Sequence, residues 1–246
     1  MSHDIRTPMN AIVGMTAIAT AHIDDRKQVE NCLRKITLSS KHLLGLINDV
    51  LDMSKIESGK LTLTTEQISL QEVTEGIVNI MQPQVKAKKQ TFDIHVDNIL
   101  TENVWCDGVR LNQVLLNLLS NATKYTPEGG AIRLSLSEEK SPKGENYGRI
   151  HINVKDNGIG MSQDFLKKIY ESYSRADGAR VHKTEGAGLG MAITKYIVDA
   201  MEGGIEVQSE IGKGTEFRIT FDFEKAAAME VDMVLPSWNM PVSYTH

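Results

Sequence analysis

The spacing of apolar residues changes once along this 246-residue chain, near residue 66. Before that point, residues 3–21 and 25–58 contain a single proline, Pro8, and carry apolar residues at helical spacing, and Gly59 follows as a stop signal. Two helices alone cannot bury an apolar stripe on each of them. The sequence therefore predicts an all-α helical hairpin that pairs with a second copy as a four-helix bundle, so we expect a homodimer.

Beyond residue 66, the alternation that is typical of strands appears in "TFDIHVD", "AIRLSLSEE", "RIHINVKD" and "GTEFRITFDF". Helical patterns lie near 70–89, 107–124 and 189–202. Together they predict a two-layer α/β sandwich, with helices on one face of a mixed or antiparallel sheet. We expect a hairpin domain over 1–65, an α/β domain over 66–226, and a linker or tail over 227–246.

The composition, with 41% hydrophobic and 24% charged residues, is typical of a folded globular protein. A formal charge of −5 without a dense Lys/Arg run argues against nucleic acid or an acidic membrane surface as partner. Cys32 and Cys106 have no metal-type or CxxC spacing, as expected of idle thiols in a reducing compartment. Because neither a membrane span nor a signal peptide is visible, we expect a cytoplasmic piece of a larger, membrane-anchored or soluble protein.

The helix expected over 107–124 carries a polar flank beside its apolar stripe. At about 100° per residue, Asn117, Asn121 and Lys124 gather some 80–140° from the stripe. An amide oxygen suits Mg²⁺ and a lysine ammonium suits phosphate. The flank therefore favours a bound ligand, although ordinary solvated side chains would give the same pattern on this helix alone.

Glycines gather at two junctions between loops and regular elements. "VKDNGIGM" places Asp156, Gly158 and Gly160 at a strand end, and "GAGLGMAI" places Gly186, Gly188 and Gly190 at a helix start. Glycine lets backbone N–H groups approach a ligand closely, and a helix N-terminus favours phosphate. Neither stretch is a GxGxxG or a Walker A motif. The polar segment between the two junctions is expected to act as a lid.

The stretch "SHDIRTPMN", residues 2–10, allows two interpretations. Thr7 can cap a helix that begins at Pro8, which would leave His3 in a disordered leader. If the helix already includes His3, the imidazole lies on the side opposite the apolar residues and faces outward. An exposed imidazole beside the carboxyl of Asp4 can serve as a nucleophile near neutral pH.

Five motifs, in this order, resemble those of the bacterial sensor histidine kinases of the hybrid type over residues 1–223. "SHDIRTPMNAI" resembles the H box of that family, "NQVLLNLLSNATKYTPEGG" its N box, "DNGIGM" its G1 box, "GAGLGMAI" its G2 box and "GKGTEF" its final glycine box. The resemblance implies that the second part has the Bergerat ATP-binding fold, which is shared with gyrase and some heat-shock chaperones.

The resemblance also implies roles for the residues of the H and N boxes. His3 would be the phospho-acceptor, Asp4 would take its proton or orient the ring, and Thr7 would position water in a reverse, phosphatase reaction. In the N box, Asn121 would hold Mg²⁺, with Asn117 beside it, and Lys124 and Tyr125 would meet the phosphates and sugar of ATP.

In the glycine boxes, Asp156 would bind the adenine amino group. The other nucleotide-binding residues that the resemblance implies are Gly158, Gly160, Gly186, Gly188, Leu189, Gly190 and Thr215. The chain departs from the family at Tyr170 and Tyr173, where the lid commonly has phenylalanines. Their rings can still pack, so this departure bears on the lid more than on nucleotide binding.

The activity that the resemblance implies is ATP-dependent phosphorylation of His3, followed by transfer to an aspartate of a response-regulator receiver domain. ATP and Mg²⁺ are the implied cofactors. Two alternatives stay open: a gyrase-like ATPase that forms no phosphohistidine, and a scaffold that only docks a receiver. The pair His3 and Asp4 argues against both.

Overall fold

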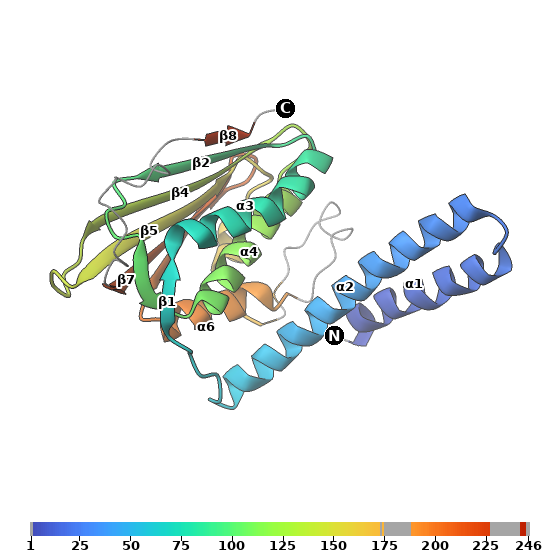
Figure 1. Cartoon of the computed structure of the whole chain (residues 1–246), viewed down its shortest axis with the longest axis horizontal. Helices are drawn as coiled ribbons and strands as arrows, with labels where there is room; N and C mark the ends of the chain where they lie inside the picture. Colours follow the sequence, from blue (N-terminus) through green and yellow to red (C-terminus); the bar gives the residue numbers. More distant parts are fainter. Residues whose placement is uncertain (1, 173, 175–187, 227–241, 245–246) are drawn as a thin grey trace. The chain divides into compact units, whose positions relative to one another are not determined.

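The chain begins with a helical hairpin in the computed structural model, which describes residues 2–172, 174, 188–226 and 242–244. Helix α1 (Ser2–Ala21) is followed after a short turn by α2 (Arg26–Glu57), and the two pack against each other (Figure 1). Asp25 caps α2, because its side chain accepts the N–H of Gln28 at 3.1 Å. The hairpin belongs to one of two compact units, which we describe separately.

Helix α1 runs through Pro8. The interpretation in which Thr7 caps a helix beginning at Pro8 is therefore wrong. A proline inside a helix removes one backbone hydrogen bond. Helix α1 packs against α2, and Pro8 itself is buried. Tertiary contacts rather than local propensity supply most helical stability, so this packing offsets the lost hydrogen bond.

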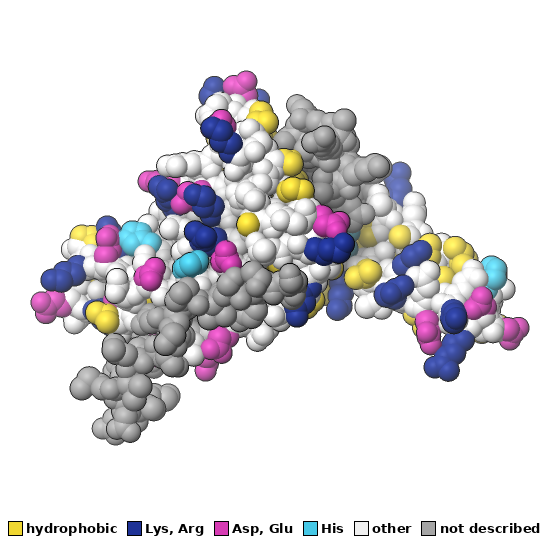
Figure 2. Space-filling view, turned by 90° about the horizontal axis from the view of Figure 1, so that it is seen from above, with side chains coloured by type: hydrophobic (Ala, Val, Ile, Leu, Met, Phe, Trp, Pro, Cys, Tyr) yellow, Lys and Arg dark blue, Asp and Glu magenta, His cyan; other side chains and the backbone are white. Residues whose placement is uncertain are grey.

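The hairpin exposes many large apolar side chains. Met9 and Val13 on α1 are 49% and 67% exposed, and α2 adds Leu33, Leu38, Leu44, Ile47 and Leu51. Figure 2 shows yellow side chains among the charged ones along the hairpin. Across the described ranges, no helix has both the length and the apolar composition needed to cross a bilayer.

The second unit contains an eight-stranded sheet with helices on one face (Figure 1). Its first elements are β1 (Glu66–Ser69), α3 (Leu70–Ala87), β2 (Thr91–Asp97), β3 (Asn103–Cys106), α4 (Gly108–Tyr125), β4 (Ala131–Lys140) and β5 (Tyr147–Asp156). They are followed by α5 (Gln163–Leu166), α6 (Gly190–Ala200), β6 (Gly204–Glu210), β7 (Gly214–Lys225) and β8 (Val242–Tyr244).

The sheet order is β1-β3-β7-β5-β4-β2-β8, and β6 pairs with β7. Among the described strands, only β2 and β4 pair in parallel; every other pairing is antiparallel. The sheet is therefore mixed, which is one of the two arrangements predicted. The helices expected near 70–89, 107–124 and 189–202 are confirmed as α3, α4 and α6.

Alternate residues of the central strands form the core beneath α3 and α4. Strand β5 buries Ile150, Ile152 and Val154. Strands β2, β4 and β7 contribute Phe92, Ile94, Leu134, Leu136, Ile219 and Phe221. The helices bury the matching stripes, which are Ile77, Met81 and Val85 on α3 and Leu111, Leu115 and Leu118 on α4. Period-two strands and period-3.6 helices thus enclose one apolar layer.

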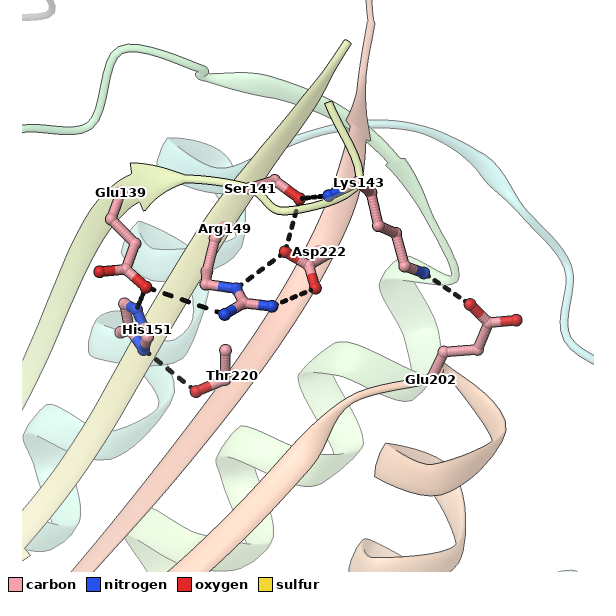
Figure 3. Close-up of polar contacts among 8 residues, drawn as sticks. All are labelled: Glu139, Ser141, Lys143, Arg149, His151, Glu202, Thr220 and Asp222. Atoms are coloured by element: carbon pink, nitrogen blue, oxygen red, sulfur yellow. Dashed lines mark hydrogen bonds and ion pairs between the residues drawn. The ribbon is translucent and has the colours of Figure 1, made fainter. Parts of the chain in front are cut away.

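The other face of the sheet carries polar side chains (Figure 3). Arg149 on β5 donates two hydrogen bonds to Asp222 on β7, each 2.9 Å long, and this holds the pKa of Asp222 below its ordinary value. His151 lies between Glu139, 2.9 Å from Nε2, and the hydroxyl of Thr220, 3.0 Å from Nδ1. Cross-strand polar pairs therefore stabilise the open face.

The C-terminal segment differs in part from expectation. Residues 227–246 were predicted as a linker or tail, yet Val242–Tyr244 forms β8 and pairs antiparallel with β2. An edge strand offers unpaired N–H and C=O groups, and a short extended segment can satisfy them.

Candidate functional site

Asp156 lies at the C-terminal end of β5 and is almost fully buried, with 9% of its surface exposed. Its Oδ1 accepts the backbone N–H of Gly158 at 2.8 Å, and the backbone N–H of Thr215 also donates to the carboxyl. Burial raises the pKa of Asp156, while the two N–H groups act in the opposite direction. A buried carboxylate is thus held in one orientation at a strand end and keeps acceptor capacity for a further donor.

Three glycines let backbone segments meet around Asp156. A Cβ on Gly158 would lie 2.7 Å from both Asp156 Oδ1 and the carbonyl oxygen of Tyr125. Gly160 and Gly214 have φ of +63° and +103°, and a Cβ on either would overlap backbone atoms of the facing segment. Only glycine fits these contacts.

A hydroxyl pair on the β6–β7 turn completes this packing. Ser209 Oγ accepts the N–H of Met161 at 2.8 Å, donates to the carbonyl of Gly214 at 2.9 Å, and lies 2.9 Å from Thr215 Oγ1. Thr215 was a predicted site residue. Sequence reasoning missed Ser209, because a serine alternating within a strand carries no signal of such a contact.

Helix α4 brings the predicted polar flank to the loop after Asp156, residues 157–162, which we call the Asp156 loop. Asp107 caps the helix by accepting the N–H of Arg110 at 3.0 Å, and it also accepts the N–H of Thr64 at 2.9 Å. At the other end, the N–H of Ile159 donates to the carbonyl of Tyr125 at 3.2 Å. The last turn of α4 therefore adjoins the loop that holds Asp156.

The predicted flank residues of α4 are all half-buried. Asn117 donates from Nδ2 to the hydroxyl of Thr194 on α6 at 2.8 Å. Lys124 Nζ lies 5.0 Å from the centre of the Tyr125 ring. Asn121 lies one turn before Tyr125, so its amide shares the end of α4 with these two side chains.

Two other groups of predicted site residues lie elsewhere in the chain. Asp4 and Thr7 are on α1, where Asp4 is half-buried and Thr7 exposed; the backbone of His3 is helical, and its side chain lies outside the described residues. Gly188 has a φ of +72°, Leu189 is buried and Gly190 begins α6, whereas Gly186 lies outside the described residues.

One of the two tyrosines that depart from the family pattern lies within the described residues. Tyr170 is half-buried, and burial, with a smaller contribution from Asp199, raises its pKa to about 12. Tyr173 lies outside the described residues.

The described donor set fits a nucleotide and its divalent cation. The Asp156 carboxylate can accept from an exocyclic amino group, and Gly158 places no side chain between this carboxylate and the carbonyl of Tyr125. Within the described ranges, no cluster of three or more His, Cys, Asp or Glu could hold a metal by itself. A cation held by the Asn121 amide oxygen together with phosphate oxygens and water would have the all-oxygen ligands that suit Mg²⁺.

Two family models match the chain. Residues 1–59 match the His Kinase A (phospho-acceptor) domain, and residues 106–225 match the histidine kinase-, DNA gyrase B- and HSP90-like ATPase family. Over 230 residues the chain is 36% identical to the autoinducer 2 sensor kinase/phosphatase LuxQ of Vibrio vulnificus (strain CMCP6). The matched region covers 94% of this chain and 26% of LuxQ. The chain thus spans about a quarter of the length of that relative.

Two solved structures share the fold. Full-length ShkA in complex with AMPPNP superposes with a TM-score of 0.67 and 30% identity, over 92% of this chain and 45% of ShkA. Histidine kinase ThkA in complex with the response regulator protein TrrA superposes with a TM-score of 0.60 and 21% identity, over 90% of this chain and 59% of that chain.

Proposed function

This chain belongs to the bacterial sensor histidine kinases, and from that premise we propose that it transfers the γ-phosphoryl group of ATP to its own His3. The observation that carries the proposal is the buried Asp156 carboxylate, held by Gly158 and Thr215 in an ATPase-type domain that follows a phospho-acceptor hairpin.

The adenine end of ATP is proposed to bind at Asp156. The carboxylate accepts from the exocyclic amino group, and Gly158 and Gly160 let the loop backbone approach the base. Thr215, hydrogen-bonded to Ser209 and through its N–H to Asp156, keeps the carboxylate oriented. A buried acceptor of this kind discriminates bases that carry an amino group from those that lack one.

The phosphates are proposed to lie along α4. Asn121 supplies an amide oxygen to Mg²⁺, Asn117 lies one turn earlier, and Lys124 and Tyr125 contact the phosphates and sugar. The lid glycines in the same proposal are Gly186, Gly188 and Gly190, with Leu189 between them. Mg²⁺, when bound, neutralises charge on the phosphates during transfer.

The transfer itself uses residues of α1. A ring nitrogen of His3 attacks the γ-phosphorus, the bond to the β–γ bridging oxygen breaks, and ADP leaves with the electron pair. Asp4, the next residue, takes the proton of the other ring nitrogen or orients the ring. The phosphoryl group then passes to an aspartate of a receiver domain, and Thr7 positions water for the reverse, phosphatase reaction.

Two partners belong to this proposal. The exposed apolar side chains of α1 and α2 support pairing with a second copy as a four-helix bundle. A response-regulator receiver is supported by the shared fold with ThkA, which was solved with the response regulator TrrA.

The type of phosphate linkage tests the proposed reaction. After incubation with ATP labelled at the γ-phosphorus, we expect a labelled protein whose label is lost in acid and kept in base. A gyrase-like ATPase would release labelled phosphate and leave the protein unlabelled. A receiver-docking scaffold would release no phosphate and would also stay unlabelled. Label that survives acid would place the phosphoryl group on a different kind of residue.

A further inference from the structure

The C-terminal end of α4 is held by two side chains from the turn between α3 and β2. Lys88 Nζ donates to the carbonyls of Thr123 at 2.7 Å, Lys124 at 2.9 Å and Thr126 at 3.3 Å. Gln90 Nε2 donates to the carbonyls of Thr123 at 3.1 Å, Thr126 at 2.7 Å and Pro127 at 3.3 Å. We call Lys88 and Gln90 the α4 clamp.

The chemistry of the α4 clamp matches the end of a helix. The last carbonyls of an α-helix have no partner within the helix and carry partial negative charge. A lysine ammonium has three N–H donors, and Lys88 meets three of these carbonyls. Gln90 is 1% exposed, so its amide forms these contacts away from solvent. Burial lowers the pKa of Lys88, yet the ammonium lies where the helix dipole favours a cation.

The opposite side of the same turn is bound by the Asp156 loop. The carbonyl of Tyr125, between those held by the clamp, accepts the N–H of Ile159. The carbonyls of residues 123–127 are thus all bound by groups from the α3–β2 turn or the Asp156 loop. Lys124 and Tyr125 therefore project from a turn that the α4 clamp holds against the loop after Asp156, and Asn121 lies on the turn directly before it.

We propose that Lys88 and Gln90 are positioning residues for nucleotide binding: they fix the last turn of α4, and with it the phosphate-side residues, relative to the adenine-side carboxylate. This inference rests on the proposed function, because it assigns the clamp to the same nucleotide site. Small displacements of positioned groups have large effects on binding and rate, so the clamp should act on affinity as well as on folding.

The test replaces Lys88 and compares nucleotide affinity with the folded fraction. In Lys88→Met, three donors are lost and the side chain becomes one heavy atom shorter, but most of its unbranched stem is kept. We expect the Kd for AMPPNP with Mg²⁺ to rise about tenfold. Calorimetry at a temperature well below the midpoint of thermal unfolding measures this Kd. The KM for ATP in His3 phosphorylation should rise by a similar factor, with the maximal rate within about twofold of the parent.

Two further variants separate positioning from folding. Lys88→Arg keeps a cation with several donors and should recover most of the affinity. Lys89→Met is the matched control, because Lys89 is exposed and pairs only at the surface with Glu128 at 2.7 Å; its Kd should equal that of the parent. If Lys88→Met does not fold, Gln90→Met carries the same comparison.

The outcomes distinguish this inference from the proposed function. An unchanged Kd with fewer binding sites per chain would mean that the clamp acts on folding alone, and would overturn the inference. An unchanged Kd at full stoichiometry would overturn it as well. If the parent chain itself does not bind AMPPNP, the proposed function fails first, and the affinity loss expected for Lys88→Met fails with it.

Discussion

Asp156 is the single residue on which nucleotide recognition depends most in this account. In Asp156→Asn, the amide oxygen can still accept the N–H of Gly158, but an NH₂ group replaces the acceptor that we propose for the adenine amino group. A lost hydrogen bond to a charged group is worth roughly 1.5–3 kcal/mol, so we expect a Kd for AMPPNP at least about tenfold higher. The control is Asp164→Asn, whose side chain is 94% exposed. Equal Kd values for both variants would contradict the assignment of Asp156.

The pH dependence of the same binding gives a second readout. Burial raises the pKa of Asp156 above its ordinary 3.8, so the folded protein takes up this proton more readily than the unfolded chain. In the nucleotide-free protein, the raised pKa of Asp156 contributes most to the free energy of unfolding below pH 3.8. This contribution to stability is lost as pH rises through the raised pKa. Nucleotide affinity has the opposite sign, because the ionised carboxylate is the better acceptor. Affinity should fall as the solution is acidified through the raised pKa, and Asp156→Asn should lack that component.

Single residues also mark the limit of prediction from sequence. Asp156 and Gly158 could be placed because an acid and glycines at a strand end have a recognisable spacing. Lys88 and Ser209 could not, because their contacts join segments that are distant in the sequence, and a lysine in "KAKKQ" looks like any solvated charge.

At the scale of elements, the loop after β5 packs closely against the end of β6 because Gly160 has no side chain. Gly160 has a φ of +63°, and an added Cβ would overlap the backbone of Glu210. We expect Gly160→Ala to lower the free energy of unfolding by about 2–4 kcal/mol, combining backbone strain with overpacking. Urea unfolding measures the change.

The matched control for Gly160→Ala lies on the facing turn. Gly212 has a φ of +79°, yet a Cβ there would meet nothing within 4 Å. Gly212→Ala therefore reports the strain alone, at about 1 kcal/mol. Equal losses in the two variants would show that the segments are not packed as described.

Element types could be predicted because periodicity is a local signal. The two hairpin helices, α3, α4 and α6 followed from apolar spacing, and β2, β4, β5 and β7 followed from alternation. Strand β8 could not be predicted, since "VSY" is too short to alternate and forms only by pairing with β2. The helical pattern expected over residues 3–21 already included Pro8, and α1 runs through it.

At the scale of the whole molecule, the account requires two copies of the chain. Leu44, Ile47 and Leu51 recur at three- and four-residue spacing, share one face of α2 and are between 41% and 58% exposed. The double variant Leu44→Glu/Leu51→Glu should sediment as a monomer at concentrations where the parent is a dimer, because it places four carboxylates in the apolar bundle of two chains. The control Lys41→Glu changes an exposed charge on the same helix. A monomeric parent, or a dimeric double variant, would contradict this arrangement.

The central claim is that one chain both binds ATP and carries the acceptor of its γ-phosphoryl group, and labelling of His3→Gln tests it most directly. The variant and the parent are incubated with ATP labelled at the γ-phosphorus, and their Kd values for AMPPNP are measured in parallel. We predict that His3→Gln binds AMPPNP within about twofold of the parent, because His3 lies on the hairpin and not in the ATPase-type domain, and that it gains no acid-labile label. An equal amount of acid-labile label on His3→Gln would contradict the account, because the acceptor would then be another residue.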